Sequence, residues 1–255
     1  MSVEYAPKGL IGVLTPQANT TVEPELAILV PPGYAWINAR LMSDKGTIED
    51  RLRDYFAGLD RALRQFANAP VDAVAVACTG ASYLAGPDAE DRALADLERI
   101  GGAPVCTAAS AVVDALRLLD AKRIGLVSPY NASLNAASTA YWTARGFDVV
   151  AKADAYRETE AFHPIYSLPS GAAQAGLDAL EDEDLDAIVM LGTGMPTLAP
   201  IRRTPRVGRA PVLSCMLAMT WRAVAAASRE PPTRDDLLDW IAARHWAARL
   251  AEPGR

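Results

Sequence analysis

The 255-residue chain carries 25 Lys and Arg against 31 Asp and Glu, and its hydrophobic and charged fractions of 51% and 22% are typical of a globular protein. The net charge of −6 argues against non-specific nucleic-acid binding. No run approaches the roughly 20 apolar residues of a membrane helix, and the N-terminus lacks the pattern of a secretory signal. Three scattered cysteines are too few for a disulfide framework. We therefore expect a cytoplasmic protein with reduced thiols and with neither a membrane nor a nucleic-acid partner.

The first half of the chain alternates short apolar runs with amphipathic stretches. Residues 10–16 and 73–77 are apolar runs that end in small or polar residues, which is typical of parallel strands buried on both faces. Residues 48–66, 89–100 and 108–119 have the apolar spacing of amphipathic helices. The pattern predicts strands joined by helical crossovers.

The second half of the chain repeats the first. Residues 123–129 match residues 10–16, and the apolar run at 187–191 matches 73–77. A third block, 102–116, matches 209–224, and the three blocks are offset by 113, 114 and 107 residues. Three matching blocks in the same order at nearly one offset indicate an internal duplication. A last helix is expected at 235–250, before Pro253 and Gly254.

These elements predict an α/β fold of two doubly wound parallel-sheet lobes related by a pseudo-two-fold axis. The first lobe is expected to span residues 1–118 and to recover the C-terminal helix at 217–255. The second lobe is expected to span residues 119–216. Ligands in such sheets bind beyond the carboxyl ends of the strands, which places the active site in the cleft between the lobes.

Polar and small residues follow four of the predicted strands. Small residues let backbone N–H groups approach a ligand closely, and a helix that starts there adds positive potential. Two such clusters that face each other suit a small carboxylate or dicarboxylate. The four segments are residues 15–21, 78–82, 128–131 and 192–194.

Cys78 is the strongest candidate for a catalytic residue. It lies at a strand end, before Thr79 and Gly80 and a predicted helix start, a setting that can make a thiol a nucleophile or a proton carrier. A buried structural cysteine is the alternative. In the repeat, Cys78 corresponds to Gly192, while the Thr-Gly pair recurs. The Thr-Gly turn is the same in both halves, but the residue before it differs. This difference indicates that the residue at this position contacts the ligand.

The other candidate side chains have weaker signals. Tyr130 could donate a hydrogen bond into the cleft or simply pack there, and His163 could act as an acid or lie on a surface loop. Cys106 is expected in the core, Cys215 in the core or behind the site, and His245 in a structural position. No spacing typical of a zinc site and no Gly-rich nucleotide loop occurs, so we expect neither a metal nor a cofactor.

Three segments resemble the aspartate/glutamate racemase superfamily, and in particular its maleate cis-trans isomerase and arylmalonate decarboxylase branch. They are residues 19–25, the pair Cys78-Thr79, and residues 128–130 with Asn135 after them. The similarity runs from about residue 9 to residue 225. It implies two cysteines, one in each lobe, that exchange protons with the two faces of the substrate.

Here the second of those positions is Gly192. Racemisation without a cofactor needs a base on each face of the carbon, so the departure disfavours an amino-acid racemase. The resemblance also implies that arylmalonate decarboxylases keep a single cysteine, in the second lobe. This chain has the opposite arrangement, with Cys78 in the first lobe.

A second departure falls at the position where the isomerases are expected to hold a substrate carboxylate with an asparagine. Alignment places Phe162 there, and a shift by one residue places His163 there. A phenylalanine would make the pocket apolar. An apolar pocket raises the free energy of a bound carboxylate and so favours the loss of CO₂.

The leading hypothesis is a cofactor-independent decarboxylase of a substituted malonate or similar small dicarboxylate, with Cys78 as the proton donor and Tyr130 as a second catalytic residue. The alternatives are a maleate cis-trans isomerase, in which Cys78 adds covalently to the double bond, and a dicarboxylate-binding protein without catalysis. The resemblance is compatible with a homo-oligomer. Substrate contacts are expected from Asn19, Thr79, Gly80, Phe162, His163, Gly192, Thr193 and Gly194.

Overall fold

The first of two parallel sheets has the strand order β2-β1-β3-β4 in the computed structural model, which describes residues 3–156 and 163–250. All of its pairings are parallel. Strands β1 and β3 have no exposed residue, as the continuous apolar runs predict. The strands are β1 (Gly9–Pro16), β2 (Tyr34–Leu41), β3 (Ala73–Val76) and β4 (Val105–Thr107).

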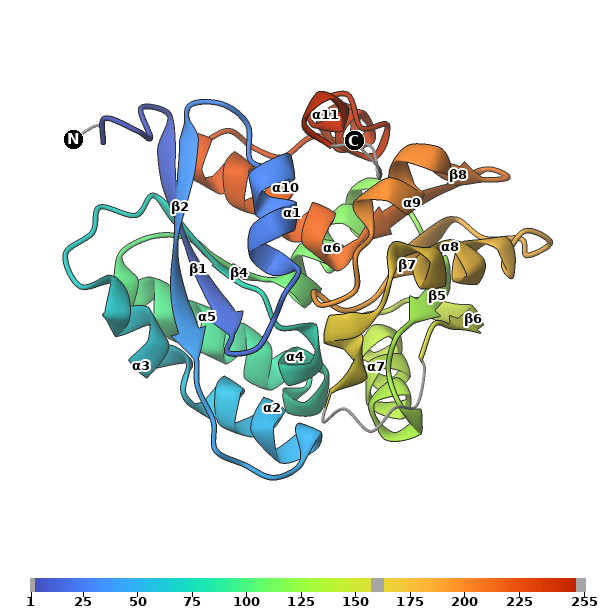
Figure 1. The fold of residues 1–255 in the computed structure, drawn as a ribbon, viewed down its shortest axis with the longest axis horizontal. Coiled ribbons are helices and arrows are strands. Elements are labelled where there is room, and N and C mark those ends of the chain that lie inside the picture. The colour runs from blue at the N-terminus through green and yellow to red at the C-terminus, as the bar shows by residue number, and fades with distance from the viewer. Residues whose placement is uncertain (1–2, 157–162, 251–255) are drawn as a thin grey trace.

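The second sheet repeats this arrangement, with the order β6-β5-β7-β9-β8. Its strands are parallel except for the short β8, which pairs antiparallel with β9. Figure 1 shows the two sheets in two lobes that lie side by side. The predicted two-lobed α/β fold is confirmed. The strands are β5 (Arg123–Ser128), β6 (Asp148–Asp154), β7 (Ala187–Met190), β8 (Arg206–Val207) and β9 (Ala210–Ser214).

Equivalent hydrogen bonds recur in the two lobes. The carboxylate of Asp72 accepts a bond from the backbone N–H of Leu10 at 2.9 Å. In the second lobe, Asp186 accepts one from the backbone N–H of Arg123 at 2.8 Å. Both aspartates lie one residue before a central strand, so the duplication preserves the contact that fixes the register of that strand to its neighbour.

The helices agree with the sequence patterns except in two places. The predicted helix at 48–66 is interrupted at Gly58, which is unfavourable inside a helix because glycine has the most backbone freedom to lose. The predicted helix at 235–250 ends at Ile241, because Ala243 takes a left-handed conformation with φ of 60°. The helices are α1 (Val22–Leu29), α2 (Ile48–Ala57), α3 (Leu59–Leu63), η1 (Arg64–Phe66), α4 (Thr79–Ala85), α5 (Pro87–Gly101), α6 (Ala108–Leu118), α7 (Ala132–Ala144), η2 (Pro164–Ser167), α8 (Ser170–Asp178), α9 (Leu198–Arg203), α10 (Cys215–Ser228), α11 (Arg234–Ile241) and η3 (Ala247–Arg249).

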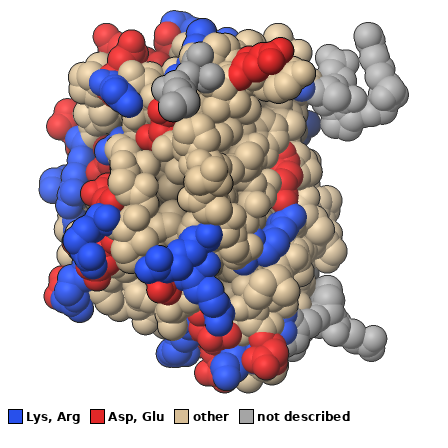
Figure 2. Space-filling view, turned by 90° about the vertical axis from the view of Figure 1, so that its left-hand side faces the viewer, with Lys and Arg blue, Asp and Glu red and all other residues tan. Residues whose placement is uncertain are grey.

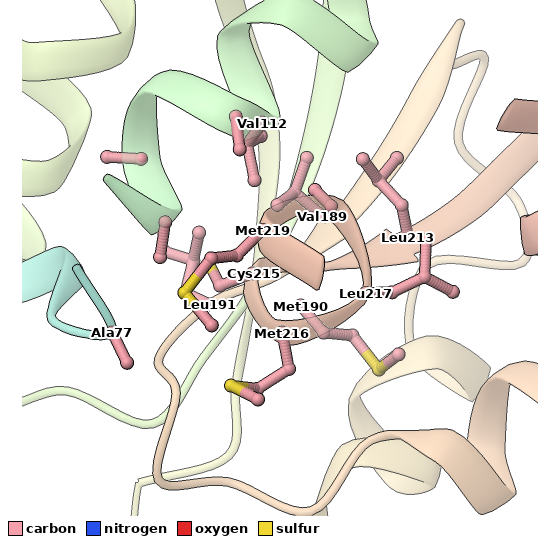
Figure 3. Packing of buried hydrophobic residues seen from close by; sticks show 14 of the residues in the cluster. Ala77, Val112, Val189, Met190, Leu191, Leu213, Cys215, Met216, Leu217 and Met219 are labelled. Carbon is pink, nitrogen blue, oxygen red and sulfur yellow. The ribbon is translucent and has the colours of Figure 1, made fainter. Parts of the chain in front are cut away.

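Helix α10 connects the lobes, because it follows β9 of the second sheet but packs against β1 and β3 of the first. It also packs along α6. Figure 3 shows side chains of α10, among them Cys215 and Met219, in one apolar cluster with Leu191 after β7 and Val112 of α6. The return of the C-terminal segment to the first lobe and the lobe boundary at residue 118 stay predictions.

The described helices include none that is long and apolar enough to cross a membrane. On the face drawn in Figure 2, acidic and basic side chains are interspersed around a broad uncharged area. Mixed charge of this kind gives that face no single-sign field toward a partner.

Glu25 of α1 binds the start of α9 and so joins the two lobes. Its carboxylate accepts bonds from the backbone N–H groups of Thr197 at 2.6 Å and Leu198 at 3.3 Å. The side chain is buried, and burial raises the pKa of Glu25 to about 7 in spite of the hydrogen bonds, which lower it. Ionised Glu25 is therefore a cost to the folded state near neutral pH.

We expect Glu25→Gln to reduce the decline in stability between about pH 4.5 and pH 7. Below pH 4.5 the carboxyl is protonated in both the folded and the unfolded state, so its ionisation does not change the free energy of unfolding. As pH rises toward the folded pKa of about 7, the unfolded chain ionises first, so the folded state loses up to about 3 kcal/mol. Thermal unfolding measured across this range tests the prediction, with Glu23→Gln in the same helix as the control. An unchanged pH profile for Glu25→Gln would contradict it.

Candidate functional site

The carboxyl ends of four strands, β1, β3, β5 and β7, meet where the two lobes touch. Asn19 follows β1, Cys78 follows β3, Tyr130 follows β5 and Thr193 follows β7. These four residues line one small cavity. The duplication explains the convergence, because each lobe brings the carboxyl ends of its two central strands to the shared boundary.

This inner cavity has a volume of about 20 Å³, enough for one small group. It combines hydroxyl and amide groups with apolar side chains from α2, α7 and η2. Nine of the ten predicted site residues are described; eight of them line the cavity and Gly192 adjoins it, and Phe162 lies outside the described residues. The described lining consists of Pro16, Asn19, Leu52, Cys78, Thr79, Gly80, Tyr130, Leu134, His163, Ile165, Tyr166, Thr193 and Gly194.

Cys78 occupies the N-cap position of α4, with an extended backbone. Cys78 is 4% exposed. Burial raises the pKa of Cys78 to about 12, although the nearby backbone N–H of Ala81 lowers it. The thiol is therefore protonated at neutral pH. A helix start can lower the pKa of a thiol, but here the cost of burying the thiolate exceeds the help from one backbone donor.

Tyr130 and Thr79 face each other across the lobe boundary, with their hydroxyl oxygens 2.9 Å apart. Only one of the two hydroxyl hydrogens is used in this bond, so the pair retains a second hydrogen to donate. Burial raises the pKa of Tyr130 well above its ordinary value, and the phenol stays neutral. Asn135 donates to the backbone carbonyl of Tyr130 at 2.9 Å and holds the turn in place.

Thr193 and Asn19 connect the lobes on the other side of the cavity. The Thr193 hydroxyl donates to the carbonyl of Ala77 at 2.7 Å and accepts a bond from the Asn19 amide at 3.3 Å. The Asn19 carbonyl oxygen accepts from the backbone N–H groups of Thr21 and Val22 and so begins α1. The hydroxyl hydrogen of Thr193 is thus engaged within the protein. Asn19 keeps a second amide hydrogen.

At Gly192, the position equivalent to Cys78, a side chain would be strained and crowded. Its φ is +82°, a conformation that favours glycine. A Cβ atom there would lie 2.8 Å from Ile165 Cδ1 and 3.1 Å from the Tyr130 hydroxyl. The close approach of Tyr130 and Ile165 therefore takes the space in which a second thiol would stand. Gly192 itself adjoins the cavity rather than lining it.

The other two cysteines lie behind or away from the cavity. Cys215 begins α10 and is fully buried, near Gly192 and Thr79. It supports the cavity wall without lining it. Cys106 is buried in β4 with no described contact to the site, and His245 packs on Trp240 near the surface. The described residues hold no group of three or more His, Cys, Asp or Glu side chains placed to bind a metal ion.

A larger outer cavity of about 370 Å³ adjoins the inner one and shares Leu52, His163 and Tyr166 with it. His163 therefore faces the site. Burial, followed by the nearby Arg51, lowers the pKa of His163 to about 4, so the ring is neutral at neutral pH. The described lining consists of Ala18, Ile48, Arg51, Leu52, Tyr55, His163 and Tyr166.

Sequence analysis missed the contribution of α2 to this cavity. Ile48, Leu52 and Tyr55 recur at helical spacing and form the apolar face of that helix. Such a face normally packs against the core, and nothing in its spacing distinguishes a face that lines a cavity.

Two facing parallel sheets with a polar cavity at their strand ends define a two-lobed α/β enzyme of the aspartate/glutamate racemase type. Residues 11–236 match the family model described as arylmalonate decarboxylase. A maleate isomerase of Nocardia farcinica is 30% identical over 220 residues, covering 82% of this chain and 86% of that protein. The chain belongs to the arylmalonate decarboxylase and maleate isomerase family and is an enzyme of that family.

Solved structures of the family have the same fold. The Nocardia farcinica maleate cis-trans isomerase, in a cysteine-to-serine variant with a covalently bound succinylcysteine intermediate, matches with a TM-score of 0.78 at 25% identity. The match covers 88% of this chain and 94% of that one. Unliganded arylmalonate decarboxylase matches with a TM-score of 0.72 at 20% identity, over 86% and 92% of the two chains, and shows similarity of fold.

Proposed function

We propose that the chain decarboxylates a substituted malonate without a cofactor and that Cys78 protonates the product. The observation that carries the proposal is a protonated thiol, the one thiol among the described residues that line the cavity, with Gly192 at the equivalent position of the other lobe, where a side chain would be strained and would crowd Ile165 and Tyr130. Loss of CO₂ followed by one protonation needs a single proton donor. Racemisation needs a group on each face of the carbon.

The inner cavity offers hydrogen-bond donors to the carboxylate that the product retains. The spare hydroxyl hydrogen of the Thr79–Tyr130 pair and the second amide hydrogen of Asn19 are the donors available to it. When the bond between the α-carbon and the departing carboxylate breaks, its electron pair delocalises into the retained carboxylate as an enediolate. Neutral donors fixed in a buried site stabilise that developing charge.

The departing carboxylate would then lie against the apolar part of the cavity, which includes Leu52, Leu134 and Ile165. An apolar contact destabilises the charged group but not the neutral CO₂ that it becomes. The Cys78 S–H gives its proton to the α-carbon, and the thiolate that results regains a proton from water. A thiol with a pKa of about 12 remains a strong acid relative to a carbanion, so its high pKa does not prevent this step.

We expect methyl(phenyl)malonate to yield CO₂ and one enantiomer of 2-phenylpropionate. The thiol reaches only one face of the enediolate, so the enantiomer should be the opposite of that from a decarboxylase whose cysteine lies in the second lobe. CO₂ release and chiral chromatography of the product test both statements. A racemic product, the same enantiomer, or no CO₂ from any malonate would contradict the proposal.

The second candidate is maleate cis-trans isomerisation. It is favoured by the 30% identity to a maleate isomerase and by the succinylcysteine in the Nocardia structure. In this reaction the Cys78 thiolate would add to the double bond, allow rotation about the resulting single bond, and leave. The protonated state of Cys78 opposes this candidate, because the nucleophile is the thiolate.

The dependence of the rate on pH separates the two reactions. If Cys78 acts as an acid, kcat should be level from pH 6 to pH 9, because the thiol remains protonated well below its pKa of about 12. If Cys78 acts as a nucleophile, kcat should rise about tenfold for each pH unit, since the thiolate fraction does so below the pKa. Rates for malonate and maleate substrates across this range provide the measurement. Fumarate formed from maleate at a rate that rises in this way would favour the isomerase.

A further inference from the structure

We infer that Glu90 and Arg145 form a clamp between the two lobes that positions Tyr130 against Thr79, and that both are positioning residues for the reaction. The inference deepens the proposed function and rests on it, because it concerns the two hydroxyl groups that face the retained carboxylate. Neither Glu90 nor Arg145 is among the described residues that line the inner or the outer cavity.

Glu90 is the centre of the clamp. It lies on α5, which packs against β4 of the first sheet, and it is fully buried. Its carboxylate accepts a bond from the Thr107 hydroxyl at 2.5 Å, which fixes it within the first lobe. From the second lobe, the Tyr141 hydroxyl donates to it, and Arg145 donates to it at 2.7 Å. A buried carboxylate is costly without such partners, so these donors favour one arrangement of the lobes.

Arg145 makes further bonds to the first lobe. It follows α7, which packs against β6 of the second sheet, and its side chain is 10% exposed. The guanidinium donates to the two carboxylate oxygens of Asp91 at 2.7 and 2.8 Å, and to the carbonyl of Pro87 at 3.3 Å. Several directional bonds to one planar group leave it little freedom, so the end of α7 has a fixed position on α5.

The clamp lies at the far end of two helices that both begin at the inner cavity. Helix α4 begins directly after Cys78, and α7 begins two residues after Tyr130. The two helices pack against each other where the lobes meet (Figure 1). A rise of about 1.5 Å per residue places Tyr141 roughly 15 Å along α7 from Tyr130. A helix is stiff, so a shift of its far end also moves the end that carries Tyr130.

Tyr83 of α4 connects the clamp to the site through direct contacts. Its buried ring packs edge to face on Tyr130, with centroids 6.1 Å apart, and against Tyr141, with centroids 5.3 Å apart. Packed side chains of this kind carry coupling between separated sites. The position of Tyr141 at Glu90 therefore affects the Tyr130 hydroxyl, which lies 2.9 Å from that of Thr79.

The test is a double-mutant cycle on kcat with methyl(phenyl)malonate. Glu90→Gln combined with Arg145→Met removes both charges, so no buried charge is left without a partner. We expect kcat to fall about 10- to 100-fold, because a small displacement of a positioned group costs that much. In a Tyr130→Phe background, where the hydroxyl pair is already lost, the same two changes should lower kcat less than about threefold.

This comparison separates positioning from folding, because a loss caused by unfolding would be equal in both backgrounds. Tyr141→Phe leaves Glu90 with Thr107 and Arg145, and it provides the same cycle with a smaller effect if the double variant does not fold. Arg222→Met is the control, because it breaks a 2.9 Å ion pair with Asp114 between α10 and α6. It should lower kcat less than about twofold in either background. Equal falls in the two backgrounds, or wild-type kcat in the clamp variants, would overturn the inference.

Alkylation of Cys78 by iodoacetamide, followed by mass spectrometry of the peptides, tests the clamp without turnover. Cys78 is buried, and lobes that open more often should label it about tenfold faster in the clamp variant. Cys106 and Cys215 are buried as well, and they report general loosening of the fold if they also label faster.

The labelling result decides the case in which no malonate is decarboxylated. Faster labelling of Cys78 alone would then overturn the proposed function and leave the clamp standing. Unchanged labelling, or equally faster labelling of all three cysteines, would then overturn both. Equal falls in kcat in an active decarboxylase would overturn the clamp alone.

Discussion

Replacement of Cys78 by alanine is expected to lower kcat by roughly 10²- to 10⁴-fold, the usual contribution of a positioned general acid. Cys78 is the one thiol among the residues described as lining the inner cavity. Without it the enediolate must take its proton from a donor, such as water, that is not positioned at the α-carbon. Single-turnover measurement of CO₂ release and of product formation tests the prediction.

Two controls separate chemistry from folding. The sulfur of Cys78 is small, so we expect Cys78→Ala to lose only about 1 kcal/mol of stability. Cys106→Ala removes an equally buried thiol that has no described contact to the cavity and should keep near-wild-type kcat. Wild-type activity in Cys78→Ala would remove this residue from the mechanism, whichever reaction the enzyme catalyses.

Replacement of Gly192 by alanine is expected to destabilise the protein by roughly 2–5 kcal/mol. A left-handed conformation costs an L-residue about 1–2 kcal/mol, and overpacking costs about 1–3 kcal/mol. The added methyl group would meet Ile165 at 2.8 Å and the Tyr130 hydroxyl at 3.1 Å. We expect kcat to fall as well, because Tyr130 must move away from Thr79. Chemical denaturation and steady-state kinetics test the two effects.

Gly146→Ala is the matched control for the backbone contribution. Gly146 has a similar φ of +90°, but no atom lies within 4 Å of the position of its Cβ. It should therefore show only the conformational cost of about 1–2 kcal/mol. Equal losses in the two variants would contradict the claim that Gly192 is closed to a side chain. By the same reasoning Gly192→Cys should not create a two-thiol racemase.

The cavity depends on bonds that cross between lobes. Thr193 donates to Ala77, Thr21 donates to Gly194 at 2.8 Å, and Tyr130 bonds to Thr79. Each of these bonds joins residues that are far apart in the chain. A change in the relative position of the lobes would alter the spacing of every donor around the retained carboxylate, so the lobe contact sets the geometry of the site.

The duplication made much of the fold predictable from sequence. The apolar runs at 73–77 and 187–191 are strands, and both are buried on both faces as expected. The sequence patterns did not reveal β2 and β6, which lie at the sheet edges. Both contain exposed or half-buried residues and lack a continuous apolar run, because one side of an edge strand meets solvent.

The sequence by itself determined the two-lobed architecture, the convergence of the four strand ends and the pairing of Cys78 with Gly192, because strand pattern and repeat offset are properties of the chain alone. Tertiary structure decided the rest. The protonated state of Cys78 depends on how deeply neighbouring elements bury it, and the exclusion of a side chain at Gly192 depends on Ile165 and Tyr130 from distant segments. The lining of the outer cavity follows from the placement of α2 over it. The burial of a side chain and its close contacts depend on residues that are far apart in the sequence, so no local sequence pattern can encode them.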